Sequence, residues 1–139
     1  MSPDHLDLTR IPTHIACVMD GNGRWAQQRG LKRTEGHAQG EHALFDTIEG
    51  ARELGIGWFT VFAFSTENWQ RPADEVRFLI NFSRTILDKR RDQLHERNVR
   101  IRFIGRRDWR VPKSLLRRME VAEDLTAANT GLTFTVAFN

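Results

Sequence analysis

Short apolar runs alternate with longer amphipathic stretches along the whole chain. Apolar runs without helical spacing predict four strands, at residues 14–19, 58–64, 99–104 and 132–138. Apolar positions that recur at helical spacing predict three helices between them, at residues 39–54, 73–97 and 112–129. This order predicts an α/β fold: a parallel sheet with helices on both faces, in a chain that ends after the fourth strand.

Two of the predicted strands differ in their expected burial. Residues 58–64 are aromatic or β-branched almost throughout, which predicts a strand buried on both faces. Residues 99–104 alternate apolar with basic positions, which predicts that one face of this strand is exposed.

Length and composition restrict the class of protein. A chain of 139 residues without repeats, low-complexity tracts or linkers predicts a single domain over residues 1–139. No apolar run approaches the roughly 18 residues that span a bilayer, and the first residues lack the features of a signal peptide. Because Cys17 is the single cysteine, no internal disulfide can form. These observations predict a cytoplasmic globular protein.

The basic residues are almost all arginine. Of 21 basic residues three are lysine, which leaves 18 arginines. The arginine fork matches phosphate oxygens, so this bias fits phosphorylated ligands, although coding bias on a solvated surface gives the same composition. The basic runs at 89–91 and 106–110 are flanked or interrupted by Asp88, Asp92 and Asp108. That pattern favours a solvated surface over a nucleic-acid footprint.

A turn-rich polar cluster follows the first predicted strand, with the sequence Asp-Gly-Asn-Gly-Arg-Trp-Ala at residues 20–26. Open parallel sheets bind ligands beyond the carboxyl ends of their strands. The two glycines let backbone N–H groups approach an anion, and a helix that begins there adds its positive end. Arg24 can pair with phosphate oxygens, whereas Asp20 would repel a diphosphate unless Mg²⁺ lay between them. The cluster therefore predicts a metal-diphosphate site rather than a structural turn with an Asp N-cap.

A second interpretation of the same cluster is a dinucleotide-binding oxidoreductase domain. Gly21-x-Gly23-x-x-Ala26 satisfies the dinucleotide fingerprint. That fingerprint requires an acidic residue about 20 residues on, at the end of the second strand. Since the second predicted strand begins only at Trp58, this alternative is disfavoured.

A second polar cluster follows the second predicted strand. Residues 65–72, Ser-Thr-Glu-Asn-Trp-Gln-Arg-Pro, offer hydroxyl, carboxylate, amide, indole and guanidinium groups. Ser, Thr and Asn in front of a helix also serve as capping residues, which is the structural alternative for this cluster. Between the two clusters, Arg33 and His37 are four residues apart and would share a face if that stretch is helical.

The stretch Met-Asp-Gly-Asn-Gly-Arg-Trp-Ala at residues 19–26 resembles the cis-prenyltransferase family, which includes undecaprenyl diphosphate synthases and isoprenyl transferases. The resemblance continues through further motifs in the family's order. They are Arg33, Gly36-His37, residues 63–69, Arg71-Pro72, Glu75 and residues 129–133. Two long motifs in this order and spacing make the resemblance specific, and together the motifs span nearly the whole chain.

The resemblance implies a Mg²⁺-dependent enzyme that joins isopentenyl diphosphate to an allylic diphosphate, such as farnesyl or geranyl diphosphate, with a new Z double bond. Asp20 would hold Mg²⁺ on the allylic diphosphate and assist its ionisation, and Asn68 is the family's proton acceptor. An amide is a poor base, so Asn68 is expected to orient groups while diphosphate or water takes the proton. The family's substrate-binding positions are Gly21, Asn22, Gly23, Arg24, Trp25, Arg33, His37, Ser65, Thr66, Glu67, Trp69 and Arg71. The predicted helix 73–97, with Leu79, Phe82 and Ile86, is expected to form a tunnel wall.

The resemblance covers only the N-terminal part of the family. Family members continue into a Tyr-Gly-Gly-Arg-like segment, an Arg-x-Gly-type motif for isopentenyl diphosphate and a second metal-binding Glu. The 139 residues alone are therefore expected to be inactive or nearly so, with an exposed sheet edge. The family also implies a homodimer at full length and at most peripheral membrane contact through the lipid product. A non-catalytic subunit that complements a partner chain is the other alternative.

Overall fold

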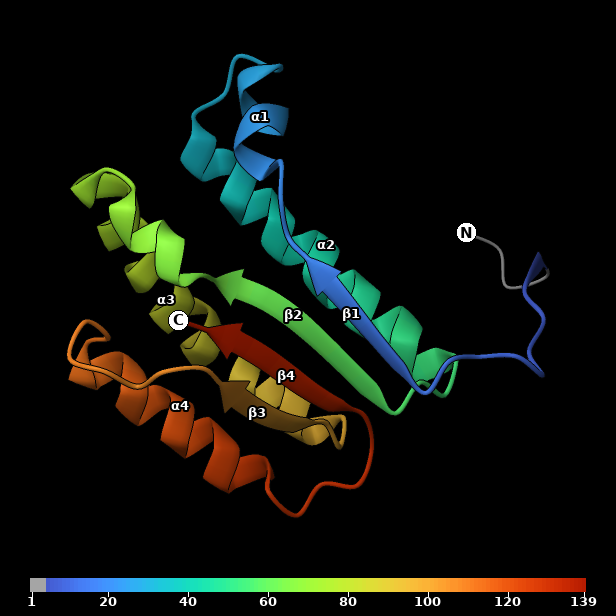
Figure 1. The fold of residues 1–139 in the computed structure, drawn as a ribbon. Coiled ribbons are helices and arrows are strands. Elements are labelled where there is room, and N and C mark those ends of the chain that lie inside the picture. Colours follow the sequence, from blue (N-terminus) through green and yellow to red (C-terminus); the bar gives the residue numbers. More distant parts are fainter. Residues whose placement is uncertain (1–4) are drawn as a thin grey trace.

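In the described part of the chain, four parallel strands form one sheet in the order β1-β2-β4-β3 (Figure 1). The computed structural model describes residues 5–139. The strands are β1 (His14–Val18), β2 (Trp58–Phe64), β3 (Arg100–Ile104) and β4 (Thr133–Phe138). The α/β class and the parallel sheet are confirmed, and each strand begins and ends close to its predicted bounds.

Helical segments connect the strands. They are α1 (Asn22–Gln27), α2 (Arg33–Glu53), the short 3-10 helix η2 (Thr66–Gln70), α3 (Ala73–Glu96) and α4 (Lys113–Thr126). α2 begins ahead of its predicted start, because the Lys32 N–H donates to the Glu35 carboxylate (2.7 Å) and caps the first turn. Gly36 and Gly40 weaken the helical pattern in that turn. Within residues 5–139, no helix combines the length and apolar character needed to cross a membrane.

One face of the sheet is buried under helices, and in Figure 1 α2 and α3 lie behind the strands. The strand register aligns a row of apolar side chains across this face: Ile15, Phe59, Phe134 and Ile101. This row packs in one hydrophobic cluster with Ile48 of α2, Leu94 of α3 and Ala122 of α4. Burial of each large side chain contributes about 1.5–3 kcal/mol, so this row supplies much of the stability of the fold.

The opposite face of the sheet is open within residues 5–139. It carries Trp58 and Phe62, whose exposed fractions are 43% and 47%. The prediction that helices cover both faces is therefore wrong for the described residues, and so is the prediction that residues 58–64 are buried on both faces. Successive strand side chains point to opposite faces, and here the open face is also apolar, so the sequence pattern matched that of a fully buried strand.

Helix α4 covers the outer edge of β3. An edge strand presents unpaired backbone N–H groups. In β3 the N–H of Ile101 donates to Thr126 Oγ1 (2.9 Å), and the N–H of Phe103 donates to Glu123 Oε2 (3.3 Å). The exposed face predicted for this strand is confirmed at Arg102. At the other side of the sheet, β1 pairs with β2 alone among the described residues, so the exposed edge lies there.

Replacement of Thr126 by valine tests the edge contact. Thr126 is fully buried, and its hydroxyl also donates to the Ala122 carbonyl (2.8 Å). Valine keeps the shape but leaves the Ile101 N–H unpaired, so we expect the free energy of unfolding to fall by about 1–3 kcal/mol in urea titrations. The matched control is Thr47→Val, an exposed threonine of α2 with the same hydroxyl bond to Ala43 (2.7 Å). Equal losses in the two variants would contradict a specific role for the edge contact.

Candidate active site

A cavity of about 220 Å³ lies between α2, α3 and the sheet. Side chains of α2 and α3 line it from the helical layer, and side chains of β2 and β4 line it from the sheet. The turn after β1 and the helix η2 after β2 contribute a polar end. The cavity therefore joins a polar mouth at the carboxyl ends of the strands to an apolar interior, the edge at which open parallel sheets bind ligands.

Both polar clusters that the sequence singles out reach this cavity. The predicted site residues that line it are Asp20, Gly21, Asn22, Gly23, Arg24, Arg33, His37, Asn68 and Arg71. Parallel pairing of β1 with β2 places the ends of these strands side by side, which brings the two clusters together.

Three glycines allow α1 and α2 to pack closely against each other. A Cβ atom at Gly23 would lie 2.6 Å from the guanidinium carbon of Arg33, and a Cβ atom at Gly40 would lie 2.5 Å from the side-chain amide nitrogen of Asn22. Gly36, one turn before Gly40, meets the Asn22 carbonyl in the same way. These contacts set Asn22 and Arg33 at the polar end. The four-residue spacing of the two α2 glycines is the sequence signal that could have revealed this docking.

Gly21 turns the chain from β1 into α1 with a φ of 86°, a conformation that favours glycine. The Asp20 carboxylate accepts a hydrogen bond from the Gly21 N–H (2.7 Å) and lies 3.6 Å from Arg24 Nη2. The Arg24 and Asp20 side chains are 71% and 78% exposed, so their ion pair contributes at most about 1 kcal/mol. Both charged groups are therefore accessible to an incoming ligand.

Guanidinium groups dominate the charge at the polar end. Arg24, Arg33 and Arg71 line it together, each from a different segment of the chain. Arg71 also pairs with Glu75 in the first turn of α3 (2.8 Å). Such a set of planar donors suits the several oxygens of a diphosphate.

His37 is half-buried at this end of the cavity. Its Nε2 is buried without a hydrogen-bond partner among the described residues, and its ring centroid lies 6.0 Å from that of Phe78. Burial lowers the pKa of His37 below its ordinary value of 6.5; Glu75 opposes that shift, whereas Arg33 and Arg71 add to it. The imidazole is therefore neutral near pH 7, with one ring nitrogen available to a ligand.

A metal ion at this end would have to be coordinated by the protein and a bound ligand together. Residues 5–139 contain no group of three His, Cys, Asp or Glu side chains that could hold a metal ion. Mg²⁺ in phosphate sites takes one or two carboxylates, and phosphate oxygens and water complete its octahedron. The exposed carboxylate of Asp20 beside the guanidinium groups fits such a shared ion.

Asn68 is the residue of η2 that lines the cavity. Its Oδ1 accepts a hydrogen bond from the Ser65 N–H (2.8 Å), and its own N–H donates to the Ser65 carbonyl (3.0 Å). Ser65 and Asn68 thus form a local cap, which is the structural alternative considered for this cluster. Ser65, Thr66 and Glu67 lie outside the cavity lining. The side-chain NH₂ of Asn68 is the group left to a ligand.

The two tryptophans of the polar clusters also lie outside the cavity lining. Trp25 lies on the outer side of α1, where the Arg29 guanidinium is 4.3 Å from its ring centroid. Trp69 packs edge-on against Phe64, with ring centroids 4.8 Å apart. In this structure both rings support the segments around the cavity rather than its wall.

The interior of the cavity is apolar. Leu79, Phe82 and Ile86 of α3 line it, as expected for the wall formed by this helix. Further lining residues come from the sheet and from α4: Val61, Phe103, Phe134, Val136, Leu115 and Met119. This interior suits a hydrocarbon rather than a polar ligand.

A charged contact that the sequence pattern did not reveal crosses from α2 to α3. Glu41, whose exposed fraction is 8%, accepts a hydrogen bond from Arg90 Nε (3.0 Å) and lies 3.4 Å from Lys89 Nζ. The Arg90 guanidinium also lies 4.5 Å from the ring centroid of Phe45. Glu41 and Arg90 line the cavity, and with Ser83 and Arg91 of α3 they add polar groups to a mostly apolar wall.

The fold and the pocket define an α/β protein suited to a ligand with an anionic head and an apolar tail. Residues 18–139 match the family described as "Putative undecaprenyl diphosphate synthase". The chain belongs to this cis-prenyltransferase family.

Two relatives and a solved structure show how similar this chain is to known proteins. It is 55% identical to a trans,polycis-polyprenyl diphosphate synthase ((2Z,6E)-farnesyl diphosphate specific) of Thermobifida fusca, covering 99% of this chain and 48% of that protein. It is 50% identical to decaprenyl diphosphate synthase of Mycobacterium leprae, over 96% and 45%. Lavandulyl diphosphate synthase from Lavandula x intermedia, solved with dimethylallyl diphosphate, superposes with a TM-score of 0.86 at 32% identity, over 91% and 54%. The chain spans about half the length of these proteins.

The buried imidazole predicts a pH dependence of stability. The folded-state pKa of His37 lies below the unfolded value, so the unfolded chain binds more protons and stability falls as the pH drops below about 6.5. Replacement by glutamine removes this proton linkage. We expect the free energy of unfolding of His37→Gln to change less between about pH 7.5 and pH 5.5 than that of the unsubstituted protein.

Chemical denaturation at each pH measures this, and His42→Gln, at an exposed position of the same helix, is the control. A pH profile of His37→Gln that matches that of the unsubstituted protein would show that His37 does not cause the dependence.

Proposed function

We propose that this chain forms the allylic-diphosphate half of a cis-prenyltransferase, which condenses isopentenyl diphosphate with an allylic diphosphate to give a Z-polyprenyl diphosphate. The observation that carries the proposal is the continuity of a cationic mouth with an apolar interior in one cavity. An allylic prenyl diphosphate has the same division between a charged head and a hydrocarbon tail. The names of the similar proteins support this substrate class.

The cationic mouth has a direct role in the proposed reaction. Ionisation of an allylic carbon–oxygen bond moves negative charge onto the diphosphate. The Arg33 guanidinium lies against Gly23 and Arg71 is paired with Glu75, and donors held in this way stabilise charge where it develops. Arg24, beside Asp20, adds a third guanidinium. The buried Nε2 of His37 offers a further polar contact to the same group.

Asp20 is the residue proposed to hold Mg²⁺ together with the diphosphate. When bound, the ion neutralises the leaving diphosphate and so favours ionisation. Asp20 lies directly before the φ-positive turn at Gly21, which sets its carboxylate beside Arg24. Its high exposure keeps the carboxylate solvated until a ligand arrives.

Asn68 is proposed to orient groups at the reacting centre. Its Oδ1 is occupied by the Ser65 N–H, so the side chain contributes a donor rather than a base. Diphosphate or water is then the proton acceptor of the condensation. The apolar interior along Leu79, Phe82 and Ile86 is proposed to hold the hydrocarbon chain.

The other features implied by the family stay predictions. They are the homodimer, the cytoplasmic location, peripheral membrane contact through the product, and the choice between farnesyl and geranyl diphosphate. The alternative function, a non-catalytic subunit that complements a partner chain, would use the same allylic half-site. The oxidoreductase alternative is not favoured, because the matching family model and the similar proteins are prenyl diphosphate synthases.

Substitution of Asp20 tests the proposal. We expect Asp20→Asn in the intact protein to lower the rate of condensation by at least about 100-fold, because the amide loses the charge that would hold Mg²⁺. The assay follows incorporation of labelled isopentenyl diphosphate into product with farnesyl or geranyl diphosphate, with and without Mg²⁺.

Asp46→Asn, at an exposed position of α2, is the charge-matched control and should keep full activity. No condensation by the unsubstituted intact protein with either allylic diphosphate would reject the proposed function. Full activity of Asp20→Asn would reject only the role of Asp20.

A further inference from the structure

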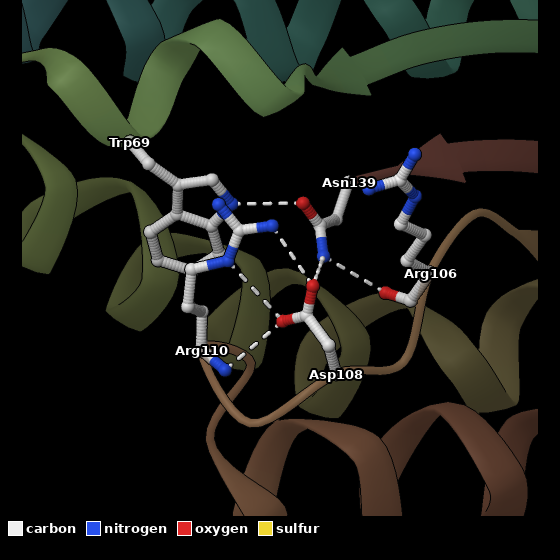
Figure 2. A network of polar contacts seen from close by, with 5 residues as sticks. All are labelled: Trp69, Arg106, Asp108, Arg110 and Asn139. Atoms are coloured by element: carbon white, nitrogen blue, oxygen red, sulfur yellow. Dashed lines mark hydrogen bonds and ion pairs between the residues drawn. The ribbon is translucent and has the colours of Figure 1, made fainter.

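The segments that follow β2, β3 and β4 meet at Asn139 (Figure 2). β4 lies between β2 and β3, so its end lies between the loops of its two neighbours. The Asn139 N–H donates to the Phe64 carbonyl (2.7 Å), and the Asn139 carbonyl accepts from the Arg106 N–H (3.0 Å). These backbone bonds join the three segments just beyond the sheet.

The side chain of Asn139 adds bonds in three directions. Its Oδ1 accepts from the indole Nε1–H of Trp69 (2.8 Å). Its Nδ2 donates to the Arg106 carbonyl (3.0 Å) and to Asp108 Oδ2 (3.2 Å), as Figure 2 shows. An inverted amide would set its NH₂ against the indole N–H, so the partners determine its orientation. Aspartate could not replace it, because a second carboxylate would face Asp108.

Asp108 and Arg110 complete the contact with Trp69. Asp108 accepts hydrogen bonds from Arg110 Nη2 (2.8 Å) and from the Arg110 backbone N–H (3.0 Å). The Arg110 bond chiefly lowers the pKa of Asp108 to about 2, so this carboxylate stays charged at neutral pH. The Arg110 guanidinium lies 5.5 Å from the Trp69 ring centroid, within the range of a cation–π contact.

Trp69 ties η2 to the rest of the fold through its bond to Asn139 and its contact with Phe64. The bonds of Asn68 run to Ser65 and Arg71, its near neighbours in the chain, so they shape η2 without attaching it to the sheet. Short 3-10 helices have poor hydrogen-bond geometry and depend on their surroundings. The orientation of Asn68 at the cavity wall therefore depends on how its neighbour Trp69 is held.

We propose that Asn139, Asp108 and Arg110 form a latch on Trp69 that positions Asn68 in the active site. We call these three residues the Trp69 latch. None of them lines the cavity, so they are positioning residues that act through Trp69. The effect of the latch on the reaction rests on the proposed function, whereas its effect on the position of η2 does not.

Asn139→Gly in the intact protein is the main test. Glycine tolerates the positive φ of 70° at this position, so the variant removes the side chain without backbone strain. In ¹⁵N-labelled protein, we expect solvent exchange of the Trp69 indole N–H to rise by about tenfold or more. We also expect the Ser65 and Asn68 amide signals to shift. The Trp69 signal is assigned from its absence in Trp69→Phe.

Kinetics then report on positioning. We expect kcat to fall by about 10- to 100-fold, with the KM for the allylic diphosphate unchanged within about twofold. Trp69→Phe keeps the ring against Phe64 but removes the indole donor, so it should reproduce this loss even if Asn139→Gly does not fold. The double variant should lose no more than either single variant. Arg107→Met is the loop-matched control, because Arg107 bonds to Glu123 outside the latch (2.6 Å).

Three results would overturn the latch. They are an unchanged indole exchange rate in Asn139→Gly, unmoved Ser65 and Asn68 signals, or an unchanged kcat alongside moved signals. If the unsubstituted protein makes no prenyl product, the proposed function fails. The Ser65 and Asn68 signals then decide the latch alone: a shift supports it and no shift overturns it.

Discussion

The parallel register of the four strands is the constraint on which the rest of the molecule depends. Because the strands run in one direction, all their carboxyl ends lie at one edge, and the segments that follow them must meet there. The buried apolar row holds this register, since a slip of one residue would turn Phe59 to the open face. The positions of Asp20, Asn68 and Asn139 therefore depend on packing in the core beneath them.

The cavity combines a charged mouth, which needs water or a ligand, with a mostly apolar interior, which excludes unpaired charge. Arg24 and Asp20 at its mouth are well exposed, so their charges stay hydrated until a ligand replaces water. His37 lies deeper and is neutral, in keeping with the cost of burying a charge. Glu41, a buried carboxylate of the inner wall, is paired with Arg90. Charge is thus placed where water or an ion-pair partner can stabilise it, and most of the other lining side chains of the interior are apolar.

Local patterns predicted the strands, the long helices and the two polar clusters, because each is set by residues close in sequence. The start of α2 was predicted too late, since Gly36 and Gly40 weaken the helical pattern there and are retained for close contact with Asn22. The open face of β2 was also missed, because Trp58 is apolar on the side that no described helix covers. The Glu41 contact with Arg90 joins two helices, and no local sequence pattern predicts it.

The sequence by itself determined the elements, their parallel arrangement, the family, and the arginine, glycine and aspartate chemistry of the polar end. Side-chain periodicity and turn chemistry are properties of a local backbone, which is why they can be read without a structure. Only the tertiary structure decided that β4 lies between β2 and β3, and hence that Asn139 reaches Trp69. It also decided that Asn68 lines the cavity while Trp69 lies outside its lining. Strand order and side-chain facing result from packing between segments distant in sequence, and no local pattern encodes that packing.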